Sequence, residues 1–143
     1  MTRIVFYFNV TNKQQLISDL VASALSKHRQ VTIVEDDADK ASKLSQDLWQ
    51  NRPESFLPNM LIDHALATET PVVVHWHENQ LLQDDMLINL TANEPIFFSR
   101  FTQLVELVSE DEQDKALARA RYKFYRDRGY EIKNIDFAQY KSE

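Results

Sequence analysis

Basic side chains are gathered in one stretch near the C-terminus, residues 115–129. This stretch carries six lysines or arginines and a single acid, Asp127, whereas the whole chain has a formal net charge of −6. A concentrated positive field on an otherwise acidic protein is suited to recognising carboxylate or phosphate groups. We therefore take the stretch as the leading candidate for a binding site, with an ordinary solvated helix face as the alternative.

A tyrosine interrupts this basic stretch. At about 100° per residue, one arc of a helix here holds Lys115, Arg119, Tyr122, Lys123 and Arg126. Basic groups around an aromatic ring suit a ligand that is acidic and also has an apolar end. Stacking of single-stranded nucleic acid on the ring is an alternative, although the acidic body of the protein counts against it.

Local signals predict that the stretch is helical. Ser109 and Glu112 fit a capping box, in which each side chain bonds a backbone amide near the other residue. Gly129, the single glycine of the chain, stands where a left-handed residue commonly ends a helix. We expect the side opposite the basic arc to face the core, and its residues are Leu117, Ala120 and Phe124.

Two other groups of residues could hold a metal ion. His75 and His77 alternate, so on a strand they share one face, with Glu78 next to them. Glu35, Asp36 and Asp37 follow a predicted strand. Strand-end histidines and helix-capping acids are the favoured interpretations, because no motif supplies a third ligand to the histidines. A metal-dependent hydrolase is the alternative.

The first two turns that follow predicted strands contain no glycine. They read Asn9-Val10-Thr11-Asn12 and Glu35-Asp36-Asp37, whereas dinucleotide sites and P-loops need glycines so that backbone amides can approach phosphate. The acidic turn would also repel phosphate. No serine lies in a nucleophile-elbow motif. We therefore expect neither a cofactor nor a bound metal, and no enzymatic activity.

Strands and helices alternate in the part of the chain that precedes this basic stretch. Continuous apolar runs predict strands at residues 3–8, 30–34 and 71–76. Helical spacing predicts a helix at about 12–28, capped by Thr11 and Gln14, and a second helix capped by Asp36 or Asp37. The inward side chains of the second helix are expected to be Ala38, Ala41, Leu44 and Leu48.

The second half of the chain is predicted less regularly. Residues 81–90 fit a weak strand or a loop, residues 94–98 a short strand, and residues 130–137 a closing strand or extended tail. A helix is predicted at about 100–108, with inward side chains Phe101, Leu104, Val105 and Val108. The whole order predicts a single α/β domain over residues 1–143, a three-layer α/β/α arrangement with a mostly parallel, mononucleotide-fold-like sheet.

Composition narrows the classes of function. The chain has 143 residues and no cysteine, which excludes disulfides and thiolate metal sites. No apolar run approaches the roughly 20 residues that cross a bilayer, and no signal peptide is evident, so we expect a cytoplasmic protein without a membrane partner. The net charge of −6 disfavours nonspecific binding to duplex DNA.

A connector at residues 47–59 carries an unusual apolar load. Pro53 and Pro58 interrupt helical structure there. Trp49, Phe56 and Leu57 are nevertheless large apolar residues. The segment either packs into the core or forms an apolar patch that anchors a protein partner.

Three segments together resemble a known family. They are Phe6-Tyr7-Phe8, the connector Leu48-Trp49-x-x-Arg52-Pro53-Glu54-Ser55-Phe56-Leu57-Pro58, and Ala118-Arg119-x-Arg121-Tyr122-Lys123-x-Tyr125-Arg126-x-x-Gly129-Tyr130. The sequence is similar to the chi subunit of bacterial DNA polymerase III holoenzyme. The similarity extends over essentially the whole chain, and these segments are its most specific parts. The loop before Pro71 lacks the glycines expected of that family, which should alter the shape of the loop alone.

The resemblance implies a non-catalytic clamp-loader accessory subunit. Members of the family pair with the psi subunit and bind the acidic C-terminal tail of single-stranded-DNA-binding protein. The positions matching the family's tail site are Val108, Lys115, Arg119, Tyr122 and Lys123. The positions matching its psi site, which is also used by helicase partners, are Trp49, Arg52, Pro53, Phe56 and Pro58.

Overall fold

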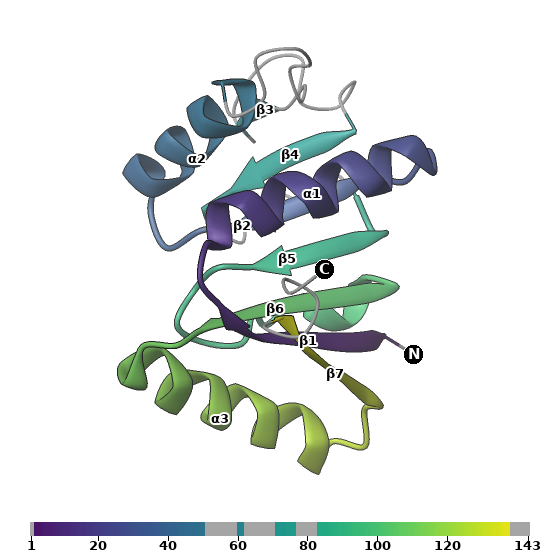
Figure 1. The fold of residues 1–143 in the computed structure, drawn as a ribbon. Coiled ribbons are helices and arrows are strands. Elements are labelled where there is room, and N and C mark those ends of the chain that lie inside the picture. The colour runs from purple at the N-terminus through teal and green to yellow at the C-terminus, as the bar shows by residue number, and fades with distance from the viewer. Residues whose placement is uncertain (1, 51–59, 62–70, 77–82, 138–143) are drawn as a thin grey trace.

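Among the residues that the structure describes, seven strands form one sheet, and every pair of neighbouring strands is parallel (Figure 1). The computed structural model describes residues 2–50, 60–61, 71–76 and 83–137. In chain order the strands are β1 Arg3–Val10, β2 Val31–Val34, β3 Met60–Leu61, β4 Val72–His75, β5 Met86–Asn89, β6 Gln103–Ser109 and β7 Ile132–Asp136. Across the sheet their order is β3-β4-β2-β5-β6-β1-β7.

In the described part of the chain, three α-helices cover the two faces of this sheet. They are α1 Lys13–Ser26, α2 Ala38–Gln50 and α3 Glu112–Asp127, and a short 3₁₀ helix, η2, spans Phe98–Arg100. One core cluster joins α1 and α2 to the sheet, and a second joins α3 and η2 to it. Alternate residues of β6 belong to the two clusters: Leu104 and Val108 lie with α3, and Val105 and Leu107 with α1 and α2. The three-layer α/β/α prediction is therefore confirmed.

Residues that flank α1 and α3 complete the two helices. Asn12 caps α1 by accepting the Gln15 amide, and Asp111 caps α3 by accepting the Asp114 amide. The caps predicted at Thr11 and Ser109 were therefore misplaced by one and two residues. Gly129 follows α3 with φ of 83°, the left-handed conformation that was expected there.

The first strands and helices agree with the prediction, whereas residues 94–108 differ from it. Residues 94–97 lead through a turn into η2, which begins at Phe98, instead of forming a strand, and the predicted helix at 100–108 is largely strand β6. The four residues expected to point inward from that helix are all buried. The error was therefore in the type of element, because a strand buried on both faces is apolar at almost every position.

The middle of the chain contributes interior strands. Residues 86–89, within the segment predicted as a weak strand or loop, form β5 between β2 and β6.

In α2, Ala41, Leu44 and Leu48 are buried as expected, but Ala38 is exposed. Within the described ranges, no helix is long and apolar enough to span a membrane.

Candidate functional site

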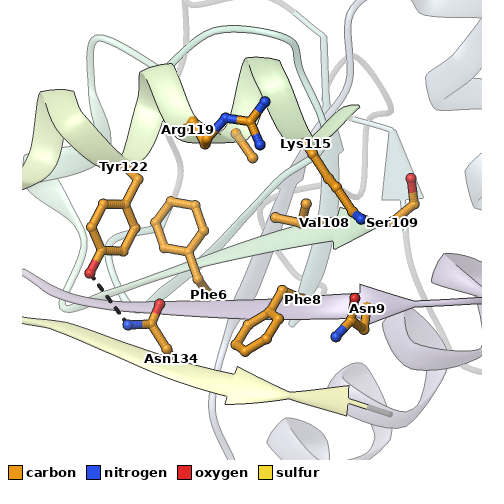
Figure 2. A pocket seen from close by; sticks show the side chains of 10 residues that line it. Phe6, Phe8, Asn9, Val108, Ser109, Lys115, Arg119, Tyr122 and Asn134 are labelled. Atoms are coloured by element: carbon orange, nitrogen blue, oxygen red, sulfur yellow. Dashed lines mark hydrogen bonds between the residues drawn. The ribbon is translucent and has the colours of Figure 1, made fainter. Parts of the chain in front are cut away.

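A pocket of about 330 Å³ opens between α3 and one end of the sheet (Figure 2). Strands β1, β6 and β7 supply its floor, and α3 supplies the opposite wall. The lining residues are Phe6, Phe8, Asn9, Val108, Ser109, Lys115, Ala118, Arg119, Tyr122 and Asn134. Ten side chains from four elements therefore meet at one hollow.

The inner surface of the pocket is apolar. Phe6, Val108 and Ala118 are buried in the core cluster that joins α3 to the sheet. The Phe6 ring meets the Tyr122 ring edge to face, with 5.2 Å between centroids, a geometry that aromatic pairs favour. The pocket can therefore accept an apolar or aromatic group.

Two cations stand on the helix side of the pocket. The Lys115 ammonium has only a loose pairing with Glu112, at 3.7 Å, and the Glu112 side chain is 86% exposed. Among the described residues, no carboxylate lies within ion-pair distance of Arg119. Both side chains are thus available to an acidic ligand, and the Arg guanidinium can hold a carboxylate with two parallel hydrogen bonds.

A bend in β1 brings an amide to the rim of the pocket. The pairing of β1 with β6 shifts register between Tyr7 and Val10, and Asn9 has φ of 60°. Asparagine adopts this left-handed conformation more readily than most residues. Its side-chain amide donates to the Asp136 carboxylate at 3.1 Å, so the rim is tied to β7.

The structure gathers most of the residues that the resemblance pointed to. Val108, Lys115, Arg119 and Tyr122 all line the pocket. Lys123 is exposed on the same helix and does not line it. Tyr122 was expected to face solvent, but it is half-buried, because its ring packs on Phe6.

The prediction for the core-facing side of α3 was wrong for two of its three residues, since only Phe124 packs against the core cluster. Leu117 is 38% exposed and Ala120 is also exposed. The buried side chains of the helix are instead Ala118, Arg121 and Tyr125. Apolar spacing failed here because an arginine, with a buried partner on the sheet, occupies the core-facing position.

That partner is Glu106, which is 0% exposed in the middle of β6. The Arg121 Nε donates to one Glu106 carboxylate oxygen at 3.0 Å. The Tyr125 hydroxyl and the Asn89 amide donate to the other oxygen, at 2.6 and 3.0 Å. Arg121 also donates to the backbone carbonyl of Ala92 at 3.0 Å. This buried network fixes α3, and with it the helix wall of the pocket, to the sheet.

Burial controls the titration of the same network. Desolvation raises the pKa of Glu106, and Arg121 and the two other donors oppose that rise. Burial and the neighbouring Glu106 raise the pKa of the Tyr125 hydroxyl, so it keeps its proton and acts as a donor. In the sequence, Arg121 and Tyr125 stand out only as part of the family motif, and Glu106 was not predicted to belong to the site. The available signal was an acid enclosed by the apolar run Leu104-Val105-x-Leu107-Val108.

The proposed psi-site residues lie mostly outside the part of the chain that the structure describes. Arg52, Pro53, Phe56 and Pro58 fall in the segment 51–59, which is not described. Trp49 belongs to the last turn of α2, so the helix extends into the start of the predicted connector.

The other candidate groups have structural roles or are only partly described. The Asp37 carboxylate accepts the Lys40 amide at 2.8 Å and thereby caps α2. His75 is buried within β4, and His77 lies outside the described residues. Among the described residues, no group of three or more His, Cys, Asp or Glu side chains could hold a metal ion.

Comparison with known proteins identifies the family. The family described as "DNA polymerase III chi subunit, HolC" matches residues 1–133. DNA polymerase III subunit chi of Pseudomonas aeruginosa is 32% identical over 138 residues, covering 94% of this chain and 96% of the relative. The chi subunits of Haemophilus influenzae and Escherichia coli are 32% and 31% identical over 120 residues, covering 83% of this chain and 83% and 82% of theirs. The chain therefore belongs to the family of DNA polymerase III chi subunits.

Proposed function

We propose that this chain is a non-catalytic, cytoplasmic subunit of the clamp-loader complex that bridges two partners. One partner is the psi subunit, and the other is the acidic C-terminal tail of single-stranded-DNA-binding protein. The single observation that carries the proposal is that one pocket combines an aromatic floor with two cations, Lys115, which is only loosely paired, and Arg119, which has no ion-pair partner among the described residues. A short acidic peptide that ends in an aromatic residue has the complementary chemistry.

Each part of the pocket has a role in holding such a tail. Arg119 and Lys115 bind the terminal carboxylate and the nearby acidic side chains. Val108 and Tyr122, with Phe6 beneath them, enclose the last aromatic side chain. Lys123, which is exposed one residue further along α3, attracts acidic residues further up the tail without lining the pocket.

The psi subunit is proposed to bind at the connector, through Trp49, Arg52, Pro53, Phe56 and Pro58. The apolar load of this segment in the sequence supports the assignment. A helicase partner would use the same surface. Because each tail is held weakly, several tails on coated single strands would act together, which raises the overall affinity.

The alternative is a module that binds single-stranded nucleic acid through α3. It requires a ring on which a base can stack. Tyr122 already has Phe6 against its ring and Asn134 at its hydroxyl, which leaves less of the ring for a base. The tail-binding function therefore fits the pocket better, and an oligonucleotide serves as the competing ligand in the test.

The test is a titration with a fluorescent peptide that copies the last residues of the tail, in parallel with oligothymidine. Arg119→Ala should weaken peptide binding by about 2 kcal/mol, or about thirtyfold, because it removes a hydrogen-bonded charge partner. Arg126→Ala is the matched control, since Arg126 is exposed on the same helix but does not line the pocket. The affinity of the wild-type protein should fall as salt is added.

Two results would contradict the proposal. Equal losses of peptide affinity in Arg119→Ala and Arg126→Ala would mean that binding depends only on the overall charge of the helix. Binding of oligothymidine without binding of the peptide would favour the nucleic-acid module.

A further inference from the structure

We infer that Asn134, on β7, determines specificity in the tail pocket by positioning the Tyr122 hydroxyl as a hydrogen-bond donor to the bound peptide. The inference rests on the proposed function. It adds a residue from β7, a strand that contributes none of the positions matched to the family's tail site. Asn134 is thus a positioning residue.

The register of the sheet places Asn134 where it can act on Tyr122. Asn134 is paired with Phe6 across the β1–β7 ladder, so the two side chains lie next to each other on the face that α3 covers. Phe6 supports the Tyr122 ring, at 5.2 Å between centroids. The Asn134 Nδ2 donates to the Tyr122 hydroxyl oxygen at 3.3 Å (Figure 2). Neighbouring strand residues therefore hold both ends of one pocket side chain.

The direction of this hydrogen bond determines what the hydroxyl can offer a ligand. A tyrosine hydroxyl has one hydrogen to donate and lone pairs to accept with. Because its oxygen accepts the Asn134 amide, its own hydrogen remains for another acceptor. Among the described hydrogen bonds, that hydroxyl donates to no protein group. A carboxylate or backbone carbonyl beside the last aromatic residue is the acceptor that this arrangement suits, and a peptide brings that acceptor within reach only when its aromatic ring is seated against Tyr122.

Asn134 also limits the motion of the ring. A ring fixed at its hydroxyl and at its face keeps the wall of the aromatic subsite in place before the peptide arrives, which lowers the entropic cost of binding. The cations Lys115 and Arg119 stand on α3 and act independently of that wall. Removing the Asn134 amide should therefore weaken recognition of the last aromatic residue more than recognition of the acids.

The experiment measures the affinity of two peptides, one with the natural aromatic end and one in which that residue is alanine. Asn134→Ala should weaken the aromatic peptide by about threefold to tenfold, the effect of one lost hydrogen bond, and the alanine peptide by less than about twofold. Lys133→Ala is the control, because Lys133 is exposed next to Asn134 and does not line this pocket. It should preserve the ratio of the two affinities.

A double-mutant cycle distinguishes positioning from a general structural effect. Tyr122→Phe removes the hydroxyl through which Asn134 is proposed to act. In that background, Asn134→Ala should cause no further loss of affinity for the aromatic peptide. A merely structural role for Asn134 would give the same loss in both backgrounds.

The outcomes separate this inference from the proposed function. If the wild-type protein binds the aromatic peptide in an Arg119-dependent way but Asn134→Ala leaves the ratio unchanged, the inference is wrong and the proposed function stands. A full additional loss in the Tyr122→Phe background would also overturn it. If the wild-type protein binds neither peptide, the proposed function fails and the inference falls with it.

Discussion

Replacing Arg121 with methionine should lower the free energy of unfolding by about 3–5 kcal/mol, the usual cost of removing one partner of a buried ion pair. The substitution keeps a long apolar side chain on α3 but removes the charge. Arg121 is 3% exposed and Glu106 is 0% exposed, so water cannot replace the lost partner. Because α3 carries Lys115, Arg119 and Tyr122, the pair also supports the candidate pocket.

The magnitude follows from the contacts that are lost and those that remain. Arg121→Met removes the 3.0 Å contact with the Glu106 carboxylate and the 3.0 Å hydrogen bond to the Ala92 carbonyl. Tyr125 and Asn89 still donate to Glu106, which keeps the loss near the low end of that range. Without the guanidinium, the pKa of Glu106 rises further above its unfolded value. The stability deficit should then be smaller at pH 5 than at pH 8.

Urea denaturation followed by far-ultraviolet circular dichroism measures the effect. Arg126→Met is the control, because the Arg126 pair with Asp127 is exposed and 3.5 Å long and should change stability by less than about 0.5 kcal/mol. Glu106→Gln combined with Arg121→Met should recover part of the loss, because no buried charge is then left alone. A loss below about 1 kcal/mol for Arg121→Met would refute this view of the network.

Two further predictions concern the rest of the fold. Burial, reinforced by the neighbouring Asp36 carboxylate, raises the pKa of Glu35 from 4.5 to about 7. The folded protein therefore favours protonated Glu35, and the stability that this group contributes is complete below pH 4.5 and is lost as the pH rises through 7. Urea titrations should show wild-type stability falling by about 1 kcal/mol between pH 5.5 and pH 8, after allowance for solvent screening, and Glu35→Gln should reduce this slope; an unchanged slope would contradict the assignment. Gly129→Ala should lower the melting temperature and reduce the free energy of unfolding by about 1 kcal/mol, because the φ of 83° at this position is strained for alanine. A steric clash is not the cause, since a Cβ would meet nothing within 4 Å. An unchanged melting temperature would argue against the backbone strain.

Most elements could be predicted from the sequence because local patterns specify them. The runs at 3–8, 30–34 and 71–76 are confirmed as β1, β2 and β4. The segment at 100–108 was misread because a strand that is apolar at almost every position also contains apolar residues at helical spacing, and Glu106 alone interrupts the run. Its neutralising partner, Arg121, lies fifteen residues further along the chain, and local spacing carries no information about such a contact.

The candidate site was predictable only in part. The charge and the tyrosine of α3 are visible in the sequence, and the family resemblance added Val108. The floor of the pocket depends on the β6-β1-β7 order of strands, which brings Phe6, Phe8 and Asn134 under the helix. Strand order follows from tertiary packing, so these three residues could not be assigned to the site beforehand.

The measurement that tests the bridge most directly uses single-stranded DNA that is coated with single-stranded-DNA-binding protein and fixed to a surface. The psi subunit is passed over it alone, with this chain, and with the Arg119→Ala variant. The account predicts that psi is retained only with the wild-type chain, and that removing the acidic tail from the coating protein abolishes retention. Equal retention of psi with and without the chain, or retention of the chain on tail-less coating protein, would contradict it.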